Sequence, residues 1–72
     1  MRNVVEDGDV LDAPSEVATR LKLTEQTLAN MRWKGEGPPF IKLGDGRFAP
    51  VRYKRSDVDA WLQSRRVSTV DA

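Results

Sequence analysis

Residues 35–39, with the sequence GEGPP, place two glycines and two prolines within five positions. Proline fixes φ and lacks the backbone N–H, and glycine favours turns, so neither a helix interior nor a central strand can run through this segment. The chain is therefore divided into two parts that must form separate elements. Because it has only 72 residues, both parts must pack around one small core.

The part before this break predicts two short helices separated by a turn. Pro14 suits a first helical turn and apolar residues then recur on one face, which predicts a helix over residues 14–21. We expect Asp12 to cap this helix, because Ala13 lacks a capping group. A second helix is predicted over residues 25–34, with Thr24 as its N-cap and a glycine directly after it.

The part after the break predicts a hairpin and a third helix. Residues 40–43 and 51–53 read as strands, joined by a long loop over residues 44–50 that begins with a Gly-Asp-Gly turn. Ser56 is the expected N-cap of a helix over residues 57–63.

The predicted fold class is mainly α with a small β-hairpin, arranged as helix-turn-helix, hairpin wing and C-terminal helix. The three-residue turn between the first two helices is typical of a helix-turn-helix unit. A lone hairpin is barely stable in water, so it must pack on the helices as a wing. We expect an acidic N-terminal arm over residues 1–10, a winged helix-turn-helix domain over residues 11–63, and a polar tail over residues 64–72.

The composition argues against enzymatic and metal chemistry. The chain has no cysteine and no histidine, which removes thiolate nucleophiles, imidazole bases and the usual zinc ligands. Asp57 and Asp59 look like a carboxylate pair, but their place in a first helical turn explains them. We predict no enzyme activity, no cofactor and no metal. No apolar run is long enough for a membrane span or a signal peptide, so we expect a cytoplasmic protein.

The charges are unevenly distributed along the chain. Residues 20–55 carry nine bases against three acids, a local net charge of +6, between two flanks whose net charge is negative. A basic segment of this kind is typical of a protein that binds a polyanion, although a solvated basic surface would show the same pattern.

The helix predicted over residues 25–34 has an outward face suited to a major groove. At 100° per residue, Leu28 and Met31 face the core, while Gln26, Asn30 and Trp33 lie opposite. Amides can bond to adenine edges, and small side chains can meet a thymine methyl group. An ordinary solvated helix face would have similar residues, and Trp33 would then pack on the wing or the C-terminal segment. The predicted recognition-helix residues are Glu25, Gln26, Thr27, Ala29, Asn30, Trp33 and Lys34.

The predicted wing supplies a second set of candidate DNA contacts. Arg47 lies at its tip, where it can enter a minor groove, and the other bases suit phosphates. Some of them are expected to pair with Glu25, Asp57 or Asp59 instead. The predicted residues of the wing and its flanks are Lys42, Arg47, Arg52, Lys54 and Arg55.

Three segments share a pattern with a known family. They are residues 23–28 (LTEQTL), 35–44 (GEGPPFIKLG) and 51–62 (VRYKRSDVDAWL). Together they resemble the excisionase and prophage-regulator branch of the MerR-like winged helix-turn-helix domains, and the resemblance covers residues 11–63. It implies a recognition helix over residues 25–34 in the major groove and a wing over residues 43–51 on the adjacent minor groove.

The sequence departs from that family in four places. Lys22 stands where the family has a turn glycine, and Ala13 stands where it has a capping Ser or Thr. Met31 replaces a frequent Trp, while Trp33 is an addition. The wing is also several residues longer than usual.

The resemblance implies double-stranded DNA as the partner and leaves two roles open. An excisionase bends attachment-site DNA, binds it cooperatively in tandem and assists a tyrosine integrase in prophage excision. A small prophage transcription regulator is the alternative. We favour the excisionase, since no residues outside the domain are left to sense a ligand. A protein-interaction adaptor that uses Trp33 and the acidic arm is a third possibility.

Overall fold

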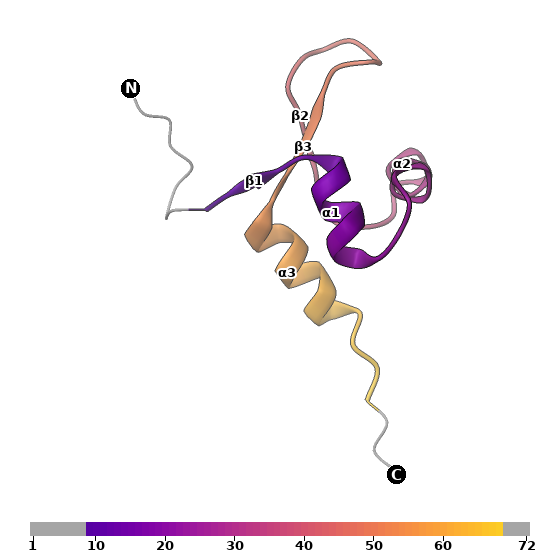
Figure 1. Cartoon of the computed structure of the whole chain (residues 1–72), viewed down its shortest axis with the longest axis vertical. Helices are drawn as coiled ribbons and strands as arrows, with labels where there is room; N and C mark the ends of the chain where they lie inside the picture. Colours follow the sequence, from indigo (N-terminus) through magenta and orange to yellow (C-terminus); the bar gives the residue numbers. More distant parts are fainter. Residues whose placement is uncertain (1–8, 69–72) are drawn as a thin grey trace.

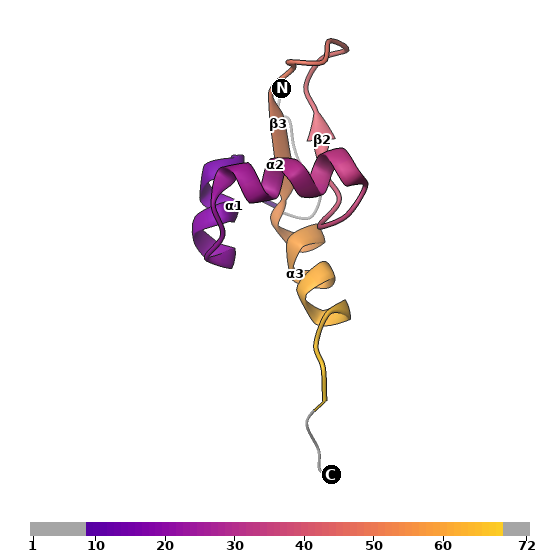
Figure 2. The same cartoon turned by 90° about the vertical axis from the view of Figure 1, so that its right-hand side faces the viewer.

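A computed structural model describes residues 9–68, which form three helices and three short strands (Figure 1). The hairpin projects to one side of the helices and α3 to the other, while α2 crosses between them (Figure 2). This arrangement confirms the predicted winged helix-turn-helix. The elements, in chain order, are β1 (Leu11–Asp12), α1 (Pro14–Leu21), α2 (Glu25–Lys34), β2 (Ile41–Lys42), β3 (Val51–Lys54) and α3 (Arg55–Ser64).

The helix-turn-helix unit has the bounds that the sequence predicted. The Thr24 side chain accepts a hydrogen bond of 3.0 Å from the Thr27 N–H, and Gly35 ends α2 with a φ of 75°. The expected Asp12 cap of α1 is wrong. The N-cap is Ala13, whose own N–H donates to the Glu16 carboxylate at 2.7 Å, so this acid makes one half of a capping box although Ala13 has no side-chain acceptor for the other half.

The core lies where β3 meets the three helices. Five buried side chains form its central cluster, and the partly buried Leu21, Met31, Val51 and Leu62 pack against them. Burial of these side chains supplies the main stabilisation of so short a chain. The buried five are Val17, Ala18, Leu28, Tyr53 and Val58.

The sheet contains a strand that the sequence analysis did not predict. Its order is β1-β3-β2, and both pairings are antiparallel. Leu11 pairs with Lys54 and the Arg55 N–H donates to the Val10 carbonyl at 2.8 Å, so the start of the domain is fastened to the far strand of the hairpin. Most of the predicted acidic arm, residues 1–8, lies outside the described residues.

The start of α3 differs from the prediction. The helix begins at Arg55, and Ser56 is not its N-cap. The Ser56 N–H and hydroxyl instead donate to the Asp9 carboxylate at 3.2 and 2.6 Å, so Asp9 satisfies a donor of the first turn from 47 positions away. Strand β2 is also shorter than the predicted strand over residues 40–43.

None of the helices in the described part of the chain is long and apolar enough to cross a membrane. Residues 9–68 also contain no cluster of acidic side chains that could hold a metal ion.

Candidate nucleic-acid interface

Helix α2 presents two chemically distinct faces. Leu28 is fully buried and Met31 is partly buried, as the periodicity predicted. Gln26, Thr27 and Asn30 are exposed on the other side. The Gln26 amide donates to the Asn30 oxygen at 3.1 Å, which aligns the two amides side by side along the helix surface.

Trp33 extends this polar face with a large apolar surface. Its side chain is 88% exposed, so, as far as the structure describes the chain (residues 9–68), it does not pack on the wing or on the C-terminal segment, which was one of the two alternatives. Leaving an indole in water forgoes about 1.5–3 kcal/mol of burial energy, which binding of a partner can recover. Phe48, at the tip of the wing, is 90% exposed, so its ring also forgoes burial energy that a partner can recover.

The wing carries Lys42 and Arg47 to the same side of the molecule as α2. In Figure 1, the loop between β2 and β3 leans toward the side on which α2 lies. Between the helix and the hairpin is a hollow of about 440 Å³. Of the predicted site residues, the fold brings Ala29, Trp33, Lys42 and Arg47 together around this hollow.

Arg32 also lines the hollow and was not among the predicted site residues. It follows Leu28 by four positions, at the edge of the core face, and its guanidinium donates to the buried Tyr53 hydroxyl at 2.9 Å. The same guanidinium lies 5.9 Å from the centre of the Phe40 ring. The signal in the sequence was Tyr53 in a predicted strand, because a tyrosine hydroxyl that becomes buried needs a hydrogen-bond partner, and Arg32 provides it.

The three predicted bases that flank the wing do not line the hollow; they are Arg52, Lys54 and Arg55. Arg52 alternates with Val51 and Tyr53 along β3, so it lies on the opposite face of the sheet. Lys54 forms an ion pair with Asp9 at 3.6 Å. The structure therefore separates these residues from Lys42 and Arg47.

Arg55 forms a two-bonded ion pair with the buried Asp12 carboxylate. Its Nε and Nη2 donate to the two oxygens of Asp12 at 3.0 and 2.7 Å. These hydrogen bonds lower the pKa of the buried Asp12 carboxyl and raise the pKa of Arg55. The Ser56 hydroxyl likewise lowers the pKa of Asp9. In the free protein, Arg55 therefore fastens β1 to α3.

The expected acidic partners of the wing bases are wrong. Within the described residues, Asp59 pairs with Arg20 of α1, while neither Glu25 nor Asp57 forms an ion pair. Arg47 instead lies 5.6 Å from the ring centre of its neighbour Phe48. The charge of the wing tip is thus left available to a ligand.

A family model described as a helix-turn-helix domain matches residues 14–66, well over half of the chain. The match begins at the first residue of α1 and extends past the end of α3. No curated protein and no solved structure matches this chain.

Proposed function

Because the chain belongs to the helix-turn-helix domain family, a family of DNA-binding domains, we propose that α2 enters the major groove of a specific duplex and the wing reaches the adjacent minor groove. The observation that carries this proposal is the hollow whose lining joins Ala29 and Trp33 of α2 to Lys42 and Arg47 of the wing. Figure 2 shows α2 crossing the molecule beside the base of the hairpin, so a duplex lying along this side would meet both.

In this proposal, α2 reads the bases. Gln26 and Asn30 are suited to adenine N6 and N7, each good bidentate contact contributing about 1–3 kcal/mol of discrimination. Thr27 and Ala29 are positioned to meet thymine methyl groups, and Glu25 can accept from a cytosine amino group. Lys34, at the exposed end of the helix, contacts a phosphate.

The wing supplies mainly electrostatic affinity. Arg47 at the tip reaches the edge of the minor groove, whose negative potential attracts arginine, and Lys42 contacts the backbone. Arg52, Lys54 and Arg55 remain flanking contacts. Their contribution is smaller, since Arg52 lies on the far sheet face and the other two are already paired with carboxylates.

Within this DNA-binding function, we propose the role of an excisionase that assists a tyrosine integrase, on the strength of the family resemblance in residues 23–62. The role requires cooperative binding of several copies along attachment-site DNA and bending of that DNA. A minimal prophage transcription regulator, by contrast, requires one complex on one operator. The two roles therefore differ in stoichiometry and in DNA shape.

A gel-shift titration on phage attachment-site DNA, with a scrambled duplex of equal length as control, tests both the DNA binding and the excisionase role. Stepwise, sequence-dependent complexes that bend the DNA in a circular-permutation assay are expected of the excisionase. A single specific complex on one short site would instead support the regulator. Absence of any shift on either duplex at low salt would contradict DNA binding and favour a protein-interaction adaptor that uses Trp33.

A further inference from the structure

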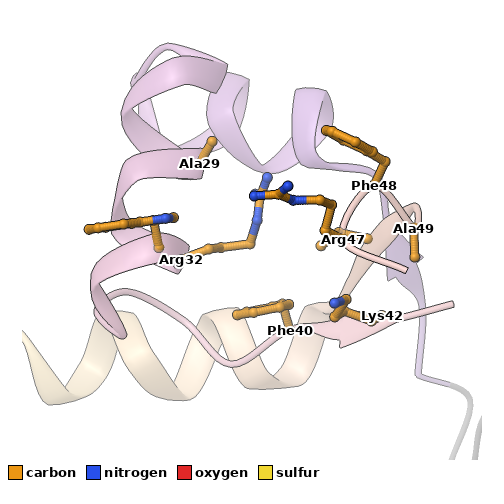
Figure 3. Close-up of a pocket in the computed structure, with 9 residues that line it drawn as sticks. Ala29, Arg32, Phe40, Lys42, Arg47, Phe48 and Ala49 are labelled. Carbon is orange, nitrogen blue, oxygen red and sulfur yellow. The ribbon is translucent and has the colours of Figure 1, made fainter. Parts of the chain in front are cut away.

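The hollow between α2 and the wing has charged and aromatic lining residues that base reading does not use. Arg32, Lys42 and Arg47 contribute three cations to it, and no Asp or Glu is among the described residues that line it. In Figure 3, the guanidinium groups of Arg32 and Arg47 extend from opposite sides toward the same space. Like charges that converge in this way repel one another, and an anion between them converts the repulsion into attraction.

Arg32 is held ready for such an anion. The buried Tyr53 hydroxyl accepts from its Nη1, and the Phe40 ring lies beneath the guanidinium. These contacts fix one nitrogen and one face of the group, and the remaining N–H donors are left for a ligand. Because the side chain is anchored to the core in advance, less conformational entropy is lost when the ligand binds.

Two exposed aromatic side chains also line the hollow. Trp33 lines it from α2 and Phe48 from the wing tip, and both remain almost fully exposed to water. A ligand that satisfies the whole hollow must therefore carry a negative charge flanked by apolar surface. A DNA strand has this pattern, because each phosphate is flanked by two deoxyribose rings.

We propose that the hollow holds one sugar-phosphate strand of the duplex, the strand that separates the major groove occupied by α2 from the minor groove reached by the wing. Arg32 and Arg47 bind one phosphate, and Lys42 binds its neighbour. Trp33 and Phe48 pack against the adjoining sugars. The contact positions α2 in its groove, since phosphate contacts set orientation and register rather than sequence preference.

This assignment rests on the proposed function, and the test separates the two. A specific duplex is first selected from a randomised pool with the wild-type protein, and failure to recover one would overturn the function itself. The phosphates of that duplex are then replaced one at a time by uncharged methylphosphonates. Affinities are measured for the wild type, Arg32→Gln, Arg47→Gln and a control, Arg66→Gln, which removes an exposed charge after α3.

One methylphosphonate between the two grooves is expected to weaken wild-type binding about tenfold or more, as the loss of a charged hydrogen bond does. Arg32→Gln and Arg47→Gln are expected to bind the unmodified duplex about tenfold more weakly. Because each variant keeps one arginine at that phosphate, each is expected to lose only about threefold further at that position. Arg66→Gln is expected to keep the full wild-type penalty.

Equal methylphosphonate penalties in the wild type and both hollow variants would overturn the assignment. So would a wild-type complex that is insensitive to every methylphosphonate yet is displaced by inorganic phosphate at constant ionic strength, because the hollow would then take a free anion. Arg32→Gln removes the guanidinium that donates to Tyr53, so thermal melting checks that this variant folds. Arg47 is exposed at the wing tip, so Arg47→Gln gives a readout that does not depend on the core.

Discussion

At the residue scale, the turn between α1 and α2 contains a non-glycine residue in a strained backbone conformation. Lys22 has a φ of 60° and a ψ of 39°, a left-handed conformation that costs a non-glycine residue about 1–2 kcal/mol. The turn of the helix-turn-helix unit requires it, because the Lys22 N–H closes on Thr19 and the Leu23 N–H on Ala18. The strain is therefore a property of the turn.

Replacing Lys22 with glycine should relieve this strain. The gain is reduced by the greater freedom of glycine in the unfolded chain, so we expect the free energy of unfolding to rise by about 0.5–1 kcal/mol. Urea denaturation measures the change. Lys22→Ala is the matched control, since it removes the same side chain but keeps the Cβ. Equal stabilisation by both variants would show that the backbone conformation is not the cause.

The Asp12–Arg55 pair should give the stability a defined pH dependence. Because the pKa of Asp12 is lowered in the folded state, its stabilising effect is present above the unfolded pKa and is lost as pH falls through the folded value. We expect Asp12→Asn to lower the free energy of unfolding by about 1 kcal/mol at neutral pH. The difference from wild type should shrink only below about pH 4.

Urea denaturation of the two proteins from neutral pH to about pH 3 measures this difference. Asp45→Asn, in the exposed wing loop, is the control and should stay near the wild-type stability. A difference between wild type and Asp12→Asn that is still undiminished at about pH 3 would contradict the pairing as the cause.

At the scale of elements, the helices were predictable wherever caps and periodicity lie within a few residues of one another. Both helices of the helix-turn-helix unit have the expected bounds for this reason. The start of α3 was misplaced, because Ser56 has the composition of a cap but is bound by Asp9, whose distant contact has no local signal. Strand β1 was missed for the same reason, since its pairing with β3 is long-range.

The two faces of α2 should respond differently to substitution. Leu28→Ala leaves a cavity in the core and should lower the free energy of unfolding by about 2–5 kcal/mol. Asn30→Ala changes an exposed residue and should alter stability by less than about 0.5 kcal/mol. It should nevertheless weaken binding to the selected duplex by about tenfold or more. Thermal melts and fluorescence anisotropy distinguish the two, and unchanged affinity in Asn30→Ala would remove this residue from the interface.

Shortening the wing should weaken DNA binding without destabilising the fold. The Leu43 N–H bonds to the Pro50 carbonyl at 2.9 Å and closes the hairpin below the loop. Replacing residues 44–49 with Asn-Gly, a favoured two-residue turn, should therefore keep the thermal midpoint near that of the wild type. Affinity for the selected duplex should fall by about tenfold or more, because Arg47 is removed. A shortened protein that binds as tightly as the wild type would show that the wing does not contact DNA.

At the scale of the whole molecule, β3 joins the two parts of the candidate interface. The wing continues from β3, while α2 is tied to the same strand through Leu28 in the core and the Arg32–Tyr53 hydrogen bond. The sequence predicted the outward face of α2 and the basic wing. It did not reveal the hollow between them, because that hollow depends on how the hairpin and the helix pack across the chain.

The most direct test of this account is the salt dependence of binding to the selected duplex and to a scrambled duplex. If α2 and the wing bind DNA as proposed, log affinity for the selected duplex falls with log salt at a slope of about −3 or steeper, near −0.9 per neutralised phosphate. Arg47→Ala should flatten that slope by about one unit, whereas Arg66→Ala should not. Equal affinity for both duplexes, or a slope that Arg47→Ala leaves unchanged, would contradict the account.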